Sequence, residues 1–251
     1  MSRWQGRSVL ITGASSGIGK AAVEAFVERG AQVIAVARNR DRLEALGVPS
    51  IVADVGDGDS MQAMADEVLA ERCPDVVVAN AGIGCDALFA NTPDASWQQV
   101  LEINVVGVVR TLRPFVEPML ARGSGRLLII SSIVGKRGTP YYSAYSASKF
   151  ALHGMADSLR AELHGSGVSV GLVCPSSTST PFNDNKLRTG SGQKQVRPRK
   201  HSAESVAEAI VKMAGSNRRE VVLGLEAKAM RWADAVAPGF IDALLARILR
   251  S

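Results

Sequence analysis

Short apolar runs rich in β-branched residues alternate along the chain with longer segments of helical periodicity. The runs are SVLIT (8–12), QVIAV (32–36), SIVA (50–53), DVVVA (75–79), RLLIIS (126–131), VSVGLV (168–173) and EVVLG (220–224). Because these runs are apolar on both faces, they are typical of strands buried inside a parallel sheet. Regular alternation of strand and helix with short connections predicts an α/β fold with a doubly wound parallel sheet and helices on both faces.

The 251 residues are enough for one large α/β domain, and we expect a single domain over residues 1–251 because no interdomain linker or repeat interrupts the pattern. Two segments break the alternation. Residues 176–201 form a long polar stretch of the kind that is either functional or disordered. Residues 227–251 are amphipathic, which predicts a helical tail that packs on the body or on another subunit. Interfacial contact with a membrane is the alternative.

The charge and the cysteines exclude several classes of protein. The net charge of +5 equals the charge of residues 183–200, which hold six basic residues and one acidic residue, so we do not expect nucleic-acid binding. The three cysteines are widely spaced, which argues against a disulfide framework or a zinc site. No apolar run reaches the roughly 18 residues of a membrane span, and the first strand begins almost at once, so the expected location is the cytoplasm.

The first apolar run leads into a glycine-rich turn, TGASSGIG, that is followed by a helical segment. Gly13, Gly17 and Gly19 lie in this turn. A glycine turn between a parallel strand and a helix gathers free backbone N–H groups and the positive end of the helix dipole, which is what a pyrophosphate needs. Glycines also serve simply as turns, but the position at the first strand–helix junction favours a dinucleotide cofactor.

The second apolar run ends in AVARNRDR, which places basic residues where the adenine ribose of a dinucleotide is bound. Enzymes that prefer NAD usually carry an acidic residue here, to bind the ribose 2′-hydroxyl. This chain has Arg38 instead, with Arg40 and Arg42 nearby, and a cation suits the 2′-phosphate of NADP. The alternative, most credible for Arg40 and Arg42, is that these are solvated charges at the start of a helix.

All three tyrosines lie in YYSAYSASK (141–149). Residues four apart share a face of a helix, and only Tyr145 is four residues before a cation, Lys149. A phenol has a pKa of about 10, and a nearby ammonium lowers it by stabilising the phenolate. Such a pair is also common on ordinary helix surfaces. Tyr142 is a candidate pocket wall, and we expect His153, one turn after Lys149, to be an ordinary surface residue.

Five motifs in order carry a resemblance to a known family: TGASSGIG, ANAG (79–82), Asn104 in EINVVG, Ser131-Ser132 after the fifth run, and YSASK. Together they resemble the short-chain dehydrogenase/reductase family, over nearly the whole chain. The resemblance implies a Rossmann-type sheet of about seven parallel strands and a substrate lid at 176–201. It also implies a homodimer or homotetramer, with the segments around 97–121 and 141–164 forming an interface.

The resemblance assigns four catalytic residues. Tyr145 corresponds to the catalytic acid/base, and Lys149 to the lysine that lowers the tyrosine pKa and binds the nicotinamide ribose. Ser132 corresponds to the serine that holds the substrate oxygen, which leaves Ser131 as strand-end structure. Asn104 corresponds to the asparagine that supports a water-linked proton relay.

Further cofactor contacts follow from the resemblance, with Asp54 beside the adenine and Thr180 at the nicotinamide carboxamide. The usual Pro-Gly is here Pro175-Ser176, a departure that affects the backbone beside the nicotinamide and not a catalytic group. Besides Tyr145 and Lys149, the expected cofactor-binding residues are Gly13, Ser15, Ser16, Gly17, Ile18, Gly19, Arg38, Asp54, Val55, Asn80, Ala81, Gly82, Pro175 and Thr180.

The implied reaction is hydride transfer between the nicotinamide of NADP(H) and a carbonyl or secondary-alcohol carbon of a small molecule, without a metal. An NAD(H)-dependent alcohol dehydrogenase of the same fold is the first alternative. A dinucleotide-sensing protein that has lost catalysis is the second, and a peripheral membrane enzyme attached through residues 227–251 is the third.

Overall fold

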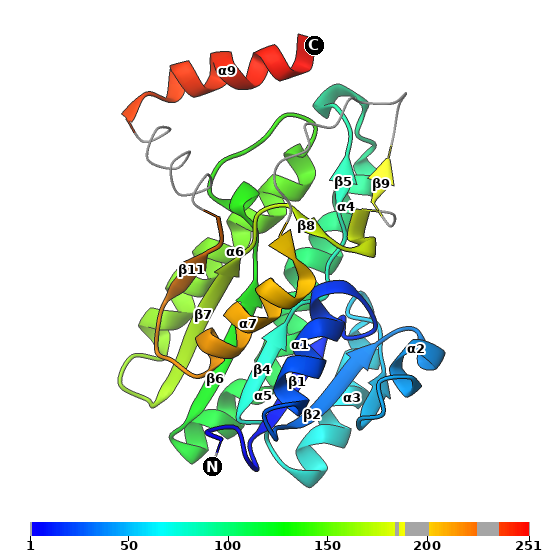
Figure 1. The fold of residues 1–251 in the computed structure, drawn as a ribbon, viewed down its shortest axis with the longest axis vertical. Helices are drawn as coiled ribbons and strands as arrows, with labels where there is room; N and C mark the ends of the chain where they lie inside the picture. The colour runs from blue at the N-terminus through cyan, green and yellow to red at the C-terminus, as the bar shows by residue number, and fades with distance from the viewer. Residues whose placement is uncertain (1, 184–185, 189–200, 225–235, 251) are drawn as a thin grey trace.

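The computed structural model describes residues 2–183, 186–188, 201–224 and 236–250. Its centre is a seven-stranded parallel sheet in the order β11-β7-β6-β4-β1-β2-β3, as Figure 1 shows. The strands are β1 (Ser8–Thr12), β2 (Gln32–Ala37), β3 (Ser50–Val52), β4 (Val76–Ala79), β6 (Gly125–Ile130), β7 (Val168–Cys174) and β11 (Glu220–Val222). The predicted doubly wound parallel sheet is confirmed, with each of the seven apolar runs forming a strand.

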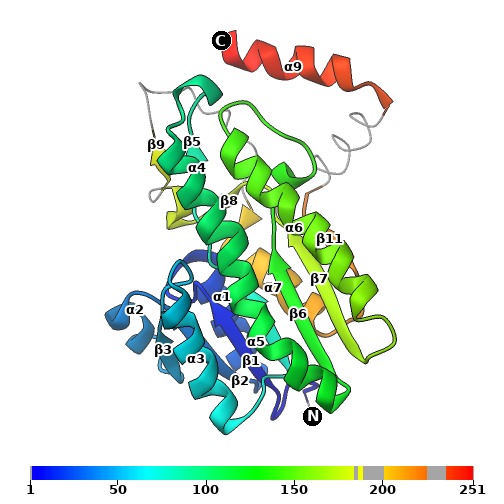
Figure 2. The ribbon, with the colours of Figure 1, turned by 180° about the vertical axis from the view of Figure 1, so that it is seen from behind.

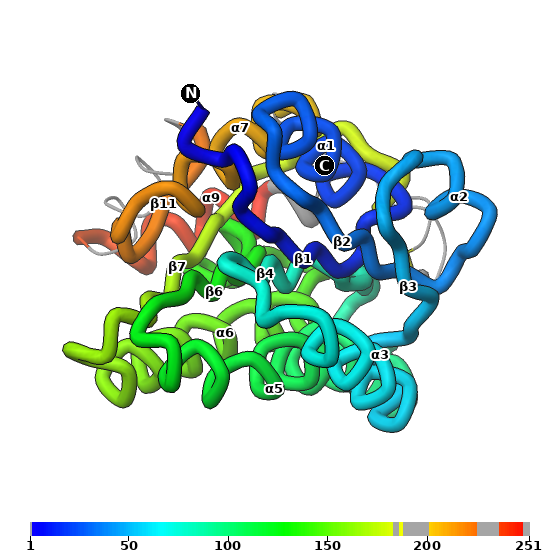
Figure 3. Tube along the Cα trace, turned by 90° about the horizontal axis from the view of Figure 1, so that it is seen from below, coloured from blue at the N-terminus to red at the C-terminus, as the bar shows by residue number. Residues whose placement is uncertain are grey.

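Helices cover both faces of the sheet, so the molecule has three layers, which are seen edge-on in Figure 3. One face carries α1 and α7, and the opposite face, seen in Figure 2, carries α3, α5 and α6. The helices are α1 (Gly17–Val27), α2 (Arg40–Glu44), α3 (Gly58–Glu71), α4 (Asp94–Leu101), α5 (Gly107–Arg122), α6 (Ser143–Glu162), α7 (Ala203–Ala214) and α9 (Pro238–Arg250).

The apolar runs are continuous because each strand contributes to two cores. In β1, Val9 and Ile11 point into the core under α1 and α7, while Leu10 points into the core under α3, α5 and α6. All three side chains are fully buried. A large apolar side chain buried in this way stabilises the fold by about 1.5–3 kcal/mol, so a polar residue on either face of the strand would be costly.

The helical stretch predicted from Trp97 onward is interrupted by one wide turn. Helix α4 continues into a π-helical turn, η2 (Glu102–Val106), before α5 begins at Gly107. Such a turn inserts an extra residue into a helix and is frequent at functional sites. Asn104, fully buried, lies in this turn.

The polar stretch 176–201 contains short elements where the structure describes it. Strand β8 (Thr178–Ser179) pairs with β10 (His201–Ser202), and β5 (Cys85–Asp86) pairs with β9 (Leu187–Arg188). A short 3₁₀ turn, η4 (Pro181–Asn183), lies between β8 and β9. Residues 189–200, which hold most of the basic cluster, lie outside the described residues.

Helix α9 forms the second half of the predicted tail and lies beyond the carboxyl ends of the strands (Figures 1 and 2). Ile241 and Leu245, one turn apart, are buried, whereas Phe240 and Leu244 are exposed. Arg137, in the loop before α6, pairs with Asp242 of this helix. The first half of the tail, 225–235, is outside the described residues. Among the helices described, none is long and apolar enough to cross a membrane.

Candidate active site

The predicted site residues follow the ends of different strands and meet at one edge. Gly13 follows β1, Arg38 follows β2, Asp54 follows β3, Asn80 follows β4 and Ser132 follows β6. All seven strands are parallel, so their carboxyl ends lie at the same edge of the sheet. In open α/β sheets, this edge is where ligands bind.

The glycine turn after β1 has no room for a side chain at Gly13 or Gly19. Gly13 has a φ of 67°, and a Cβ added there would lie 2.8 Å from the Cα of Ala81. A Cβ added to Gly19 would lie 2.1 Å from the carbonyl oxygen of Gly13. Ser16, the N-cap of α1, makes no side-chain capping bond, so the first N–H groups of the helix are not covered by that side chain. This cradle fits a pyrophosphate.

The segment after β4 is tied to the glycine turn. The hydroxyl of Thr12 accepts from the backbone N–H of Asn80 at 3.2 Å. The side-chain amide of Asn80 donates to the carbonyl of Thr12 at 2.9 Å and to that of Gly13 at 3.3 Å. The structure therefore brings Asn80 and Ala81, two of the predicted cofactor-binding residues, against the turn.

Arg38 and Asp54 form an ion pair, with 3.6 Å between Nη1 and Oδ2. The Arg38 side chain is 68% exposed, so the pair is solvated and leaves the guanidinium accessible. The Asp54 carboxylate also accepts from the N–H of Gly56 at 2.9 Å, which fixes the loop after β3 that contains Val55. These are the two residues that the sequence placed around the adenosine.

Tyr145 is partly buried on the first turn of α6, and the side chain of Ser132 interacts with its hydroxyl. Ser132 starts the short turn η3 (Ile133–Gly135), and its Oγ accepts from the N–H of Val134 at 3.4 Å. Burial raises the pKa of the Tyr145 phenol, while the bond to Ser132 opposes that rise. The phenol is therefore held in its protonated form.

Lys149 is deeply buried, and burial lowers its pKa to about 8. Its ammonium donates to the carbonyl of Ile130 at 2.9 Å and lies 5.6 Å from the centre of the Tyr145 ring. The helical spacing puts the ammonium over the ring and not against the phenol oxygen. In the polypeptide itself, burial dominates and raises the Tyr145 pKa, and a lowering by Lys149 together with an oxidised nicotinamide stays a prediction.

Asn104 connects the π-helical turn to the segment after β4. Its Oδ1 accepts from the N–H of Ile83 at 2.8 Å, and its Nδ2 donates to the Ile83 carbonyl at 2.9 Å. Nδ2 also lies 3.0 Å from the hydroxyl of Ser148, which donates to the carbonyl of Tyr145 at 2.7 Å. Asn104 therefore braces both the cofactor-side loop and the helix that carries Tyr145.

Thr180 closes over the glycine turn from the far side of the site. A Cβ added to Gly17 would lie 3.1 Å from the Thr180 Cβ, so these two predicted cofactor-binding residues are close in space. Pro175 follows β7, and its carbonyl accepts from the N–H of Ile133 in η3. Ser176, at the position of the missing glycine, has a buried Oγ that finds no hydrogen-bond partner among the described residues.

Aromatic and charged side chains lie beside Tyr145. The ring of Phe182 is 5.8 Å from that of Tyr145. The Lys186 ammonium lies 4.9 Å from the centre of the Tyr142 ring and 3.3 Å from its hydroxyl, which is 3.5 Å from the carboxylate of Asp86. These contacts fit Tyr142 as a pocket wall beside Tyr145.

Sequence reasoning missed the polar contacts behind Lys149. His153, expected on the helix surface, has a side chain only 13% exposed and an Nε2 that lies 3.2 Å from the hydroxyl of Ser131. The prediction for His153 is wrong, because α6 turns this face inward, against β6, β7 and β11. The i+4 spacing from Lys149 was the available signal, but it identifies only a shared face.

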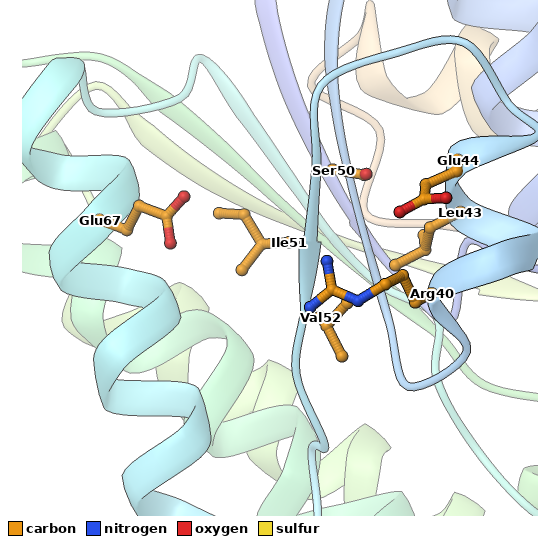
Figure 4. Close-up of a pocket in the computed structure, with 7 residues that line it drawn as sticks. All are labelled: Arg40, Leu43, Glu44, Ser50, Ile51, Val52 and Glu67. Atoms are coloured by element: carbon orange, nitrogen blue, oxygen red, sulfur yellow. The ribbon is translucent and has the colours of Figure 1, made fainter.

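A separate hollow of about 280 Å³ lies at the outer edge of the sheet, between α2, β3 and α3 (Figure 4). Arg40, Glu44 and Glu67 line it together with Leu43, Ser50, Ile51 and Val52. This lining holds none of the predicted site residues and no acid/base pair with the geometry of Tyr145 and Ser132. Across the part of the chain that the structure describes, no cluster of three metal-ligating side chains occurs.

Comparison with known proteins identifies relatives of this chain in sequence and in fold. The sequence profile described as short chain dehydrogenase matches residues 7–190. The uncharacterized oxidoreductase YbbO of Escherichia coli K12 is 34% identical over 197 residues, which are 76% of this chain and 73% of that protein. The 3-oxoacyl-[acyl-carrier-protein] reductase FabG of Thermotoga maritima is 34% identical over 192 residues, 72% of this chain and 78% of that protein. A Burkholderia cenocepacia short chain dehydrogenase solved with NADP is 25% identical, with a TM-score of 0.82 over 98% of both chains.

Proposed function

This chain belongs to the short-chain dehydrogenase family, and we propose that it is an NADP(H)-dependent oxidoreductase acting on a carbonyl group or the corresponding secondary alcohol of a small molecule. The observation that carries the proposal is the meeting of Tyr145, Ser132 and buried Lys149 at the same sheet edge as the glycine cradle. NADP(H), when bound, supplies or accepts the hydride. The residues of the chain supply the proton and hold the substrate oxygen.

In carbonyl reduction, Tyr145 gives its proton to the developing alkoxide, and Ser132 donates a hydrogen bond to the same oxygen. A phenol with a raised pKa is protonated at neutral pH, which is the form that a general acid requires. General acid catalysis contributes about 10²–10⁴-fold and one oxyanion donor about 10²–10³-fold. Lys149, with its pKa near 8, is mostly protonated at pH 7 and carries the positive charge of the site.

Replacement of Tyr145 by Phe tests this assignment. The change removes one hydroxyl and keeps the ring that packs beside Phe182. We expect no measurable NADPH oxidation with a panel of carbonyl substrates, while NADPH still binds, as measured by its fluorescence. Tyr141→Phe, four residues earlier, is the matched control and should retain activity. Near-normal turnover in Tyr145→Phe would refute the mechanism, and binding without turnover in the unaltered protein would favour the dinucleotide-sensing alternative.

The preference for NADP over NAD rests on Arg38. Its guanidinium is accessible at the end of β2, and a cation here suits a 2′-phosphate. The relative from Burkholderia cenocepacia, which is solved with NADP, is consistent with this preference. A charge-assisted hydrogen bond contributes about 1.5–3 kcal/mol, so Arg38→Asp should lower the ratio of NADPH to NADH efficiency by about 10-fold or more. Arg42→Asp, on exposed α2, is the control. An unchanged ratio in Arg38→Asp would leave the NAD(H)-dependent alternative.

We also propose that the protein forms a homodimer or homotetramer through the outer faces of α4, α5 and α6. Leu101, Val106 and Phe150 are exposed apolar side chains on this side of the molecule. A second copy of the chain would cover them. Light scattering after size exclusion measures the assembly, and Phe150→Asp should shift it toward the monomer.

A further inference from the structure

A chain of polar contacts runs along α6 from Lys149 to His153, two helical turns beyond Tyr145. The Ser131 hydroxyl lies 3.3 Å from the carbonyl of Lys149 and 3.2 Å from Nε2 of His153. On the other side of the ring, Nδ1 lies 3.8 Å from Oε2 of Glu220, the first residue of β11. Glu220 also accepts from the ammonium of Lys136 at 2.7 Å. Four separate elements therefore meet at one imidazole.

The order serine, histidine, carboxylate is that of a nucleophilic triad, but the surroundings do not allow that chemistry. Ser131 is only 3% exposed, and its hydroxyl is enclosed by the Lys149 carbonyl and by the backbone at Gly135. No substrate carbonyl can reach it. The cluster can therefore contribute only by holding neighbouring residues in position.

We propose that His153 is a positioning residue, which locks the strand end carrying Ser132 onto the helix carrying Tyr145 and Lys149. The proposal rests on the oxidoreductase function proposed above, because it concerns the geometry of that site. Ser131 is bonded to Ser132 in the chain, so fixing the Ser131 hydroxyl fixes where Ser132 meets the phenol. The pairing of Tyr145 with Lys149 would not by itself set the distance between the Ser132 hydroxyl and the phenol.

The contacts of Lys149 show how the two elements are held. Its ammonium donates to the carbonyl of Ile130 at 2.9 Å, while its backbone carbonyl accepts from the Ser131 hydroxyl. A Cβ on Gly135 would lie 2.8 Å from that carbonyl, so the turn η3 packs directly on α6. Loss of the His153 contact frees Ser131 from one of two partners at the point where strand end and helix meet.

The charges around the ring set its protonation. The groups that face it are Lys136 before α6, Asp157 and Arg160 on α6 itself, Cys174 on β7 and Glu220 on β11. Burial, together with Lys136, lowers the pKa of His153 to about 4, so the ring is neutral at pH 7. The Ser131 hydroxyl has one proton, which it donates to the carbonyl of Lys149 at 3.3 Å. Its oxygen can then accept from the ring, so the neutral imidazole carries its proton on Nε2 and donates to Ser131 at 3.2 Å.

Kinetics of His153→Leu and His153→Gln test the positioning role. Leu fills the space without a polar atom, and Gln returns a polar group toward Ser131. We expect kcat to fall about 10- to 100-fold in His153→Leu with the KM for NADPH unchanged, and to recover substantially in His153→Gln. Ser131→Ala should lower kcat in the same way, and this variant replaces His153→Leu as the test if the leucine variant does not fold. The control is His164→Gln, at an exposed position just after α6.

A merely structural role would lower the melting temperature and leave kcat per folded molecule unchanged. Folded His153→Leu and Ser131→Ala proteins with kcat within twofold of the unaltered protein would overturn the proposal. A deuteride isotope effect from [4-²H]NADPH adds a second readout, because a misplaced Ser132 slows the chemical step and raises the observed effect.

Histidine ¹⁵N spectra test the arrangement without any turnover. At pH 7, His153 should show a neutral ring protonated on Nε2, and Ser131→Ala, which removes the acceptor, should move the proton toward Nδ1. A charged ring or an Nδ1–H tautomer in the unaltered protein would contradict the proposal. If no carbonyl substrate is turned over by the unaltered protein, the oxidoreductase proposal fails, while the spectra still decide the arrangement of His153.

Discussion

Replacing Asn104 by Asp tests the brace between the π-helical turn and the cofactor-side loop. The two side chains have the same shape, and Asp keeps the oxygen that accepts from Ile83 N–H at 2.8 Å. It loses the Nδ2 donor to the Ile83 carbonyl at 2.9 Å and to Ser148 at 3.0 Å. The Ile83 carbonyl then faces an oxygen in a fully buried place, and each unsatisfied buried group costs about 1–3 kcal/mol.

The cost of Asn104→Asp should depend on pH. Burial raises the pKa of a carboxyl, so the folded protein holds a proton on Asp at pH values where the unfolded chain, with a pKa of about 3.9, has lost it. Stability therefore falls as pH rises above about 4, by up to 1.4 kcal/mol per pH unit. At acid pH, the protonated carboxyl donates to the Ile83 carbonyl and restores one bond. We expect a loss of about 1 kcal/mol at pH 4.5 and about 3 kcal/mol or more at pH 7.5.

Urea unfolding of Asn104→Asp and the unaltered protein at both pH values measures this difference. Asn217→Asp, at an exposed position, is the control and should show the same small change at each pH. Equal losses for Asn104→Asp at pH 4.5 and 7.5 would refute the reasoning, because a brace through a buried amide donor must be sensitive to the charge that replaces it.

Three further predictions concern other parts of the site. Gly13→Ala places a Cβ 2.8 Å from Ala81 and should weaken NADPH binding at least tenfold by titration, whereas Gly47→Ala, with a similar φ of 64° and open space around it, should lower stability alone. Tyr141→Phe should leave kcat within twofold of normal, since the contact of Tyr141 with Ala87 is made by its backbone carbonyl. On acidification from pH 6.5 to 4, the unfolded chain protonates His153 before the folded protein does, so the unaltered protein should lose about 3 kcal/mol more stability than His153→Gln in urea unfolding at the two pH values.

The strands of the parallel sheet and the glycine cradle could be predicted from the sequence, because apolar runs and glycine turns are local signals. The turn at Gly13 to Gly19 and the tyrosine–lysine spacing are complete within a few residues. The parallel arrangement then follows from right-handed crossovers, which leave the strand ends at one edge. This reasoning predicted the sheet and the cradle, whereas the roles of Asn104, Ser132, Tyr145 and Lys149 came from the resemblance of five motifs to a known family.

The electrostatic state of these residues depended on the tertiary structure. The spacing of Tyr145 and Lys149 suggested a phenol made more acidic by an ammonium, but burial raises the pKa of Tyr145 and lowers that of Lys149. The ammonium is directed to the carbonyl of Ile130, a residue 19 positions earlier in the chain. Desolvation and long-range hydrogen bonds have no signature in a helical period.

The sequence by itself determined the layers of this protein, the family to which it belongs and the residue types at the sheet edge, since each is written in short-range patterns. The tertiary structure alone decided which polar groups meet. It brought His153 from an assumed surface to a position between Ser131 and Glu220, residues separated by 89 positions, and it made Asn104 the common partner of Ile83 and Ser148. The physical reason is that a buried polar atom must find a partner wherever the fold provides one, and that partner is seldom a neighbour in the chain.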